Sequence, residues 1–261
     1  MKENKIIERL RVHLEEVKKY YPEKNIIGIF LFGSQNYGTD IETSDIDSKC
    51  LIIPTVEQLF FNEKVNNQTL FLNNNEQCSI IDIREYIKMI KKQNINFVEI
   101  LFTDYRLINQ KYRWIWKQFT ACKESFAYYS VSQTLNSVGS QALNTLKQYY
   151  NNPKENKKIY NVKRLSYFLS FYLESVLKKE KNYKKCLTME DTALPYYLKK
   201  IRTGAVIIPS KELQELEKEL KFFIDYSKKY QDNKKEQRIK DLMLNTFLTK
   251  FFKKYLEDID N

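Results

Sequence analysis

A glycine–serine pair follows a run of apolar residues near the start of the chain. Ile26 to Phe32 is a short apolar segment, typical of a buried β-strand, and Gly33-Ser34 interrupts it. Glycine permits a tight turn in which backbone N–H groups lie close to a bound phosphate, and the Ser34 hydroxyl adds a further donor. The segment therefore predicts a phosphate-binding turn at the end of the first strand.

Three carboxylates follow this turn at positions that suit a metal site. Asp45 and Asp47 are spaced i, i+2, so both side chains point to the same face of an extended backbone. Two such carboxylates are costly to hold together without a cation, and Mg²⁺ or Mn²⁺ bound also by substrate phosphates removes that cost. Asp82 lies in the otherwise apolar segment 79–83, where a neighbouring strand would bring it beside the pair. The set predicts two-metal nucleotidyl transfer, with Asp82 binding the activating metal.

The elements expected to position these residues fall into two parts. The first part is predicted to contain a helix over 5–20, strands over 26–32 and 46–53, a hairpin over 70–83 and a helix over 84–92. Beyond residue 107 the strand signals fade, and helical patterning fills 111–150, 158–180, 188–202, 210–229 and 234–257. We therefore expect an α/β (α+β) domain with a small mixed sheet over 1–107, followed by an all-α domain over 108–261.

Charge and composition indicate which partners the protein could have and whether it could enter a membrane. The 261 residues carry 44 basic and 33 acidic side chains, and residues 151–261 hold 25 and 16 of these, a net charge of +9. This concentration favours a polyanionic partner such as RNA, although an AT-rich genome would also produce a chain rich in Lys and Asn. The chain has no apolar run of roughly 20 residues and begins without the apolar stretch of a signal peptide. We expect a cytoplasmic protein with no membrane partner.

Histidine and cysteine offer little support for other chemistry. The cysteines at positions 50, 78, 122 and 186 form no CxxC pair, which argues against a zinc site or a disulfide framework. The single histidine, His13, lies in a charged, helix-like stretch where a solvated position is expected. Histidine-dependent nucleophilic catalysis is therefore not expected.

The order and spacing of the turn and the carboxylates resemble a known family. Residues 33–47 read G-S-x-x-Y-G-T-D and then S-D-x-D, which resembles the signature of the DNA polymerase beta superfamily of nucleotidyltransferases. Within it, the chain resembles the bacterial and phage group of RNA-ligase-associated predicted nucleotidyltransferases, also over residues 83–102. Lys163-Arg164-Leu165 and Ile201-Arg202-Thr203-Gly204 resemble two basic motifs of that group's helical half. The resemblance covers most of residues 25–205.

The resemblance implies a role for each matching residue of the turn and the carboxylates. Gly33 and Ser34 would hold the β- and γ-phosphates of an NTP. Asp45 and Asp47 would bind both metals, and Asp82 would complete the site of the activating metal. The first part of the chain would thus be a nucleotidyltransferase domain.

The remaining matches concern nucleotide contacts. Arg164 and Arg202 would clamp a triphosphate or an RNA phosphate, with a solvent-facing helix position as the alternative. Tyr37 would contact the nucleotide, or it would pack. Asn96-Phe97 stands where the group usually has Asn-Pro, a departure after the third carboxylate.

We therefore expect an enzyme that transfers a nucleoside monophosphate from an NTP to a hydroxyl, with Mg²⁺ or Mn²⁺, and releases pyrophosphate. The basic second half and the resemblance favour an RNA end as acceptor, in RNA repair or tailing, with an RNA ligase as a possible partner. A protein partner or a small molecule is an alternative acceptor. A further alternative is an inactive module that binds nucleotide or RNA.

Overall fold

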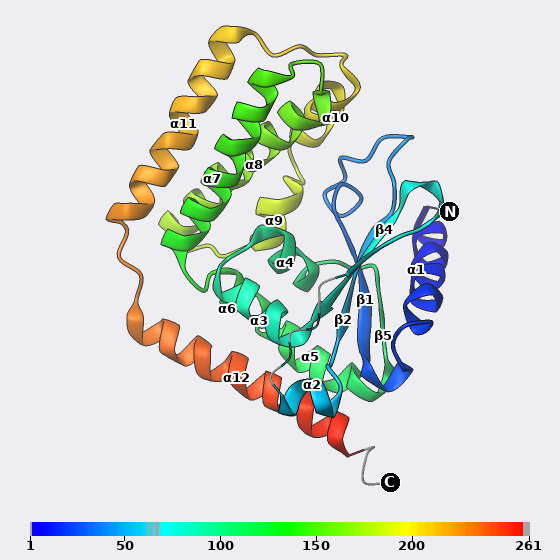
Figure 1. Cartoon of the computed structure of the whole chain (residues 1–261). Coiled ribbons are helices and arrows are strands. Elements are labelled where there is room, and N and C mark those ends of the chain that lie inside the picture. Colours follow the sequence, from blue (N-terminus) through cyan, green and yellow to red (C-terminus); the bar gives the residue numbers. More distant parts are fainter. Residues whose placement is uncertain (1, 62, 64, 66–67, 258–261) are drawn as a thin grey trace.

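Five strands form one mixed sheet in the order β3-β4-β2-β1-β5 (Figure 1). The computed structural model describes residues 2–61, 63, 65 and 68–257. The strands are β1 (Ile26–Phe32), β2 (Asp47–Ile52), β3 (Gln68–Phe71), β4 (Gln77–Asp82) and β5 (Arg106–Ile108). β2 runs antiparallel to β1 and parallel to β4, and β3 and β4 form the predicted hairpin. The expected mixed α/β architecture with a small mixed sheet is confirmed.

Helices make up most of the rest of the chain. Those of the first half are α1 (Lys2–Lys18), α2 (Val56–Phe60), α3 (Ile83–Lys91), α4 (Ile95–Val98), α5 (Arg113–Ala121) and α6 (Lys123–Ala127). Those of the second half are α7 (Val131–Asn151), α8 (Asn156–Leu177), α9 (Tyr183–Thr188), α10 (Leu194–Thr203), α11 (Ser210–Lys229) and α12 (Lys234–Leu256). Within the described ranges, no helix has the length and apolar character needed to cross a bilayer.

The sheet is buried on both faces, which is why β1 and the end of β2 are continuous apolar runs. Helix α1 covers one face through Ile6, Leu10 and Val17, and α3 and α5 cover the other (Figure 1). Gly28 of β1 permits the close approach of β5, because a Cβ atom at this position would lie 2.7 Å from the Leu107 carbonyl oxygen.

His13 is buried in α1 rather than solvated, which corrects the sequence-based expectation. Its Nδ1 lies 2.7 Å from Ser48 Oγ, and its Nε2 lies 3.0 Å from a Glu76 carboxylate oxygen. Arg9 makes an ion pair with the same carboxylate. Burial is the main cause of the lowered His13 pKa. The cluster attaches α1 to β2 and to the start of β4.

The helical half does not begin at residue 108 as a separate packing unit. The predicted helical segment 111–150 is divided into α5, α6 and α7, and Ser130 and Asp232 together cap the start of α7. The ring of Trp116 in α5 lies 4.5 Å from that of Phe30 in the sheet, and α12 returns to place Tyr255 beside Asn25. Helices α5, α6 and α12 therefore belong to the sheet layer.

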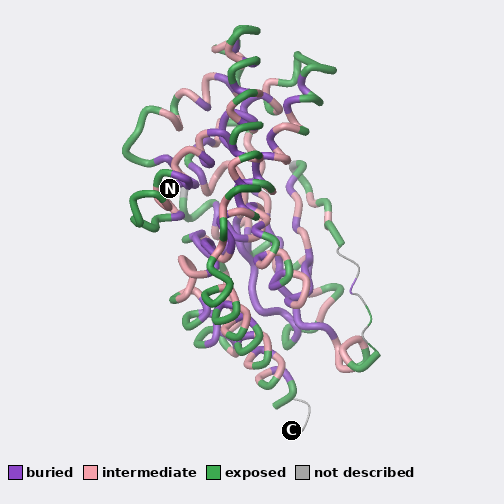
Figure 2. Tube along the Cα trace, turned by 90° about the vertical axis from the view of Figure 1, so that its left-hand side faces the viewer, coloured by how far each residue is buried: buried purple, intermediate pink, exposed green. Residues whose placement is uncertain are grey.

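Helices α7, α8, α10 and α11 form the bundle that stands against the sheet layer (Figure 1). α7 packs against both α8 and α11, and α10 packs against α8. Figure 2 shows that buried residues continue from the strands into these helices, with exposed positions on the outer turns. The continuous core holds one side of α8 against the loop that follows β1.

Candidate functional site

A cavity of about 250 Å³ lies between the sheet layer and the bundle. It is lined by residues of the β1–β2 loop, the α4 region, and helices α7, α8 and α10. Seven of the eight residues predicted from the sequence line it: Gly33, Ser34, Tyr37, Asp45, Asp47, Arg164 and Arg202. The structure thus brings together residues that are up to about 170 positions apart in the chain.

The turn after β1 forms the floor of this cavity. Gly33 and Gly38 have φ angles of +88° and +68°, values that other residue types rarely adopt. The backbone folds back on itself between them, with the Asn36 N–H donating to the Gly33 carbonyl and the Tyr37 N–H to the Ser34 carbonyl. The Gly33 N–H donates to Glu99 at 3.4 Å, so this donor already has an anionic acceptor. Ser34 lines the cavity beside it.

Asp45 and Asp47 lie next to the turn because of the strand register. Phe32 at the end of β1 pairs with Asp47 at the start of β2, and Asp45 precedes that strand. The Gln77 N–H donates to Asp47 Oδ1 at 3.0 Å. Burial, and then the charge of Asp45, raise the pKa of Asp47 from 3.8 to about 6. A pair of carboxylates under this repulsion is a favourable place for a cation.

Asp82 does not lie at this site, which corrects the expected three-carboxylate cluster. β2 and β4 are parallel, and Asp82 pairs with Ile52, five residues beyond Asp47. At about 3.3 Å per residue, this places Asp82 about 16 Å from the start of β2. Its carboxylate instead caps α3, accepting from the Arg84 N–H at 2.7 Å and pairing with the Arg84 guanidinium at 2.6 Å.

Replacing Asp82 with Ala therefore lowers stability rather than damaging the cavity. Loss of a helix N-cap costs about 1 kcal/mol in the free energy of unfolding. Asp82→Asn retains the capping oxygen and costs less. Urea unfolding and ligand binding in the cavity, measured on both variants, check this expectation. Unchanged stability together with loss of metal-dependent binding would restore Asp82 to the site.

Two buried charged residues that the sequence analysis did not select belong to this region, and one of them, Glu99, lines the cavity. Glu99 is buried, and its carboxylate accepts from the Tyr37 hydroxyl and the Gly33 N–H. Lys49 is buried two residues after Asp47, with its Nζ 3.1 Å from the centre of the Phe32 ring. Burial lowers the pKa of Lys49 to about 8, and the charges of Glu99 and Asp47 oppose that shift. A lysine inside an apolar strand was the signal available in the sequence.

Arg164 is buried in the wall that α8 contributes. Its guanidinium lies 4.2 Å from the centre of the Tyr37 ring, so the Tyr37 side chain packs under the arginine. The Nε and Nη1 atoms are buried and have no hydrogen-bond partner within the part of the chain that the structure describes. An unpaired buried donor costs about 1–3 kcal/mol, more when it is charged. These two donors favour an anionic ligand in the cavity.

Arg202 and Lys157 add positive charge on the same side. Arg202 in α10 donates to the Thr39 carbonyl at 3.3 Å and lies over the Tyr160 ring. The Tyr160 hydroxyl is 2.5 Å from the Thr39 hydroxyl, which connects α8 to the end of the turn. Lys157, at the start of α8, is exposed, and its charge partly offsets the rise in the Asp47 pKa that burial causes. The bundle thus places three cations opposite the two carboxylates.

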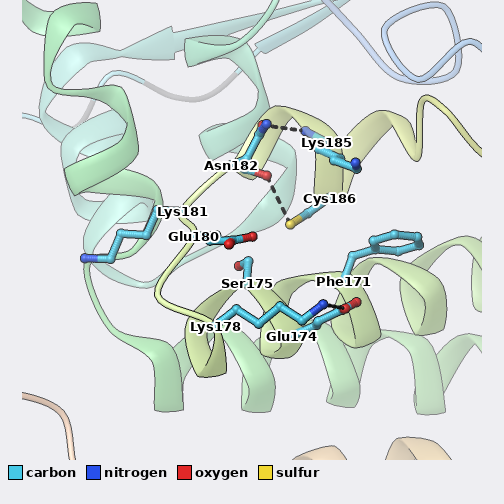
Figure 3. A pocket seen from close by; sticks show the side chains of 9 residues that line it. All are labelled: Phe171, Glu174, Ser175, Lys178, Glu180, Lys181, Asn182, Lys185 and Cys186. Atoms are coloured by element: carbon cyan, nitrogen blue, oxygen red, sulfur yellow. Dashed lines mark hydrogen bonds and ion pairs between the residues drawn. The ribbon is translucent and has the colours of Figure 1, made fainter.

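A larger hollow of about 500 Å³ lies where α8 ends and α9 begins (Figure 3). Its polar groups serve the local fold: Asn182 caps α9 by accepting from the Lys185 N–H, and Lys178 pairs with Glu174. The Cys186 thiol donates to the Asn182 carbonyl. None of the residues selected from the sequence lines this hollow.

Asp45 and Asp47 are the carboxylates of the cavity that could hold a divalent cation, which would take its other ligands from phosphates and water. Among the residues that the structure describes, no three or more His, Cys, Asp or Glu side chains are grouped so as to hold a metal. Magnesium is commonly bound in proteins by one or two carboxylates together with substrate phosphates. No protein-family model matches the chain, and no curated protein matches it.

Proposed function

We propose that this chain is a metal-dependent nucleotidyltransferase that transfers a nucleoside monophosphate from an NTP to a hydroxyl and releases pyrophosphate. The observation that carries the proposal is the buried guanidinium of Arg164: this residue lines the cavity together with Asp45 and Asp47, and two of its nitrogens have no hydrogen-bond partner among the described residues. Such a cavity combines sites for a polyanion and for a cation. A nucleoside triphosphate bound with Mg²⁺ supplies both.

In this proposal, the carboxylates of the cavity bind the metal, and the turn and the arginines bind the phosphates. Asp45 and Asp47 hold Mg²⁺ or Mn²⁺, which neutralises charge on the phosphates. Ser34 donates to a phosphate from the turn, and Arg164 and Arg202 bind phosphate oxygens from the bundle. Gly33 contributes through its backbone conformation, because its N–H is directed to Glu99. The Tyr37 ring packs against the Arg164 guanidinium.

The reaction needs a hydroxyl placed on the side of the α-phosphorus opposite the leaving group. The acceptor oxygen forms a bond to the α-phosphorus, and the bond from that phosphorus to the bridging oxygen breaks. The hydroxyl proton passes to water, and the electron pair of the broken bond leaves with pyrophosphate. Arg164 and Arg202 offset the charge that accumulates on the leaving group.

An RNA end is the acceptor that the charge distribution favours. Residues 151–261 carry a net charge of +9, and Lys157, Arg164 and Arg202 bring part of that charge to the cavity. A phosphate backbone is attracted to such a surface, and its affinity falls as salt is raised. An RNA ligase or another repair enzyme would then act on the same RNA, as the family resemblance suggests.

Transfer activity should rise as pH increases through about 6. Because the pKa of Asp47 is raised to about 6, this carboxyl is protonated below that pH and then binds a cation poorly. Added Mg²⁺ should move the midpoint to lower pH, because the metal competes with the proton. Rates measured from pH 5 to pH 8 at two Mg²⁺ concentrations check both points. A midpoint that does not respond to Mg²⁺ would contradict the assigned metal ligands.

Calorimetric titration of each NTP, with and without Mg²⁺, tests the binding part of the proposal. We expect binding of at least one NTP that requires Mg²⁺ and is lost in Asp45→Asn/Asp47→Asn. Failure of every NTP to bind in the presence of Mg²⁺ or Mn²⁺ would contradict the proposal.

One observation favours the alternative of a nucleotide-binding module without transfer activity. Asp82 serves as a helix cap, and Gln77 and Ser79 occupy the β4 positions next to Asp47 and Lys49. The activating-metal site expected from the sequence is therefore not assembled from Asp82. Such a module would bind NTP with Mg²⁺ but leave it intact.

A further inference from the structure

Glu99 is a buried carboxylate in the lining of the cavity. It is 1% exposed, and one of its oxygens accepts from the Tyr37 hydroxyl and the Gly33 N–H. The other oxygen, Oε1, is buried and has no hydrogen-bond partner among the described parts of the chain. A buried carboxylate oxygen without a hydrogen bond is costly unless a cation or a hydrogen-bond donor lies near it.

Two buried cations flank this carboxylate from opposite layers of the molecule. Lys49 comes from the sheet and Arg164 from the bundle. Burial raises the pKa of the Glu99 carboxyl, and the charges of Lys49 and Arg164 oppose that shift and favour the charged form. Glu99 therefore lies beside the groups that would hold a phosphate in the proposed function, Arg164 and the turn at Gly33. A phosphate bound there has a negative carboxylate as a close neighbour, and like charges in a poorly solvated site repel strongly.

We infer that Glu99 is a positioning residue that keeps the turn in place, and Arg164 through the Tyr37 ring, in the empty site, and that its charge weakens phosphate binding so that pyrophosphate can leave. This inference rests on the proposed function. Its two effects have opposite signs for ligand affinity: the hydrogen bonds of Glu99 organise the site, whereas its charge opposes the anion. Variants that separate the charge from the hydrogen bonds can therefore distinguish them.

Glu99→Gln removes the charge and keeps an oxygen that can accept from Tyr37. We expect pyrophosphate, titrated with Mg²⁺ in a calorimeter, to bind about tenfold more tightly to this variant than to the wild type. The matched variant is Tyr37→Phe, which removes the hydrogen bond and keeps the Glu99 charge. It should bind pyrophosphate no more tightly than the wild type. A purely structural Glu99 predicts weaker binding in both variants, and that result would overturn the inference.

A second variant covers the possibility that Glu99→Gln fails to fold with Lys49 left uncompensated. Lys49→Met/Glu99→Gln removes both members of the buried pair and keeps the net charge of the site. We expect pyrophosphate affinity within a few-fold of the wild type, whereas loss of binding in this folded double variant would also overturn the inference. If the wild type itself binds neither pyrophosphate nor NTP with Mg²⁺, the proposed function fails first. If the wild type binds but Glu99→Gln shows no tightening, only the role of Glu99 fails.

Discussion

Replacing Asp45 or Asp47 with Asn should lower nucleotidyl transfer by about a thousandfold or more while leaving the fold intact. Each substitution removes a charge that the proposed cation requires, and electrostatic groups at a reacting centre commonly contribute 10²–10³-fold individually. The fold should tolerate the change, because the two carboxylates repel each other and burial already disfavours the charged form of Asp47. Rates at saturating NTP and urea unfolding curves measure the two effects separately.

Glu42→Gln is the matched control for these variants. Glu42 is exposed in the same loop, three residues before Asp45, and it does not line the cavity. Its substitution removes one negative charge and should leave the rate within about twofold of the wild type. Full activity in both Asp45→Asn and Asp47→Asn would exclude the assigned metal site.

Arg164→Met should weaken NTP binding by about a hundredfold without a matching loss of stability. A charge-assisted contact to phosphate contributes about 1.5–3 kcal/mol, and Arg164 offers two free nitrogens for such contacts. In the absence of ligand those nitrogens are buried and unpaired. A methionine, which replaces only the aliphatic part of the side chain, removes that cost together with the cation–π contact with Tyr37 and the charge that Arg164 places near Glu99, so the net effect on stability is small. Calorimetric affinities for NTP and urea unfolding of the ligand-free protein give the two readouts.

The Arg164→Met variant is informative because a ligand-binding arginine and a structural arginine predict opposite effects on NTP affinity and on the free energy of unfolding. Arg113→Met, at an exposed position on α5, is the control and should change neither quantity. A purely structural arginine would give the reverse pattern, with a large loss of stability and unchanged NTP affinity in the folded fraction. That pattern would remove Arg164 from the proposed site.

The local parts of the site could be predicted from the sequence because their geometry depends on neighbouring residues. The Gly33-Ser34 pair after an apolar run predicts a tight turn, and the i, i+2 spacing places Asp45 and Asp47 on one side of an extended segment. Arg164 was selected by the family resemblance, and its buried neighbours on α8 agree with its observed place in the lining of the cavity. The turn and the carboxylate spacing need no knowledge of the whole fold.

The position of Asp82 could not be predicted in the same way, because it depends on strand direction. An antiparallel partner would have brought the end of β4 to the start of β2. In the parallel register, the end of β4 lies next to the end of β2, far from Asp47. Asp82 and Glu85 do have the D-x-x-E spacing of a helix start, and this local signal agrees with the observed cap. The return of α12 to the sheet, with Tyr255 beside Asn25, has no local signal at all.

A transfer assay with α-³²P-labelled NTPs tests the proposed function most directly. The protein would be incubated with Mg²⁺ or Mn²⁺, each NTP, and short RNA, tRNA, single-stranded DNA, protein or aminoglycoside acceptors, with Asp45→Asn/Asp47→Asn as the control. We expect label in RNA, released pyrophosphate, and no label with the double variant. Label in protein or in an aminoglycoside would keep the chemistry and replace the acceptor. Metal-dependent NTP binding without label in any acceptor would contradict transfer and favour a binding module.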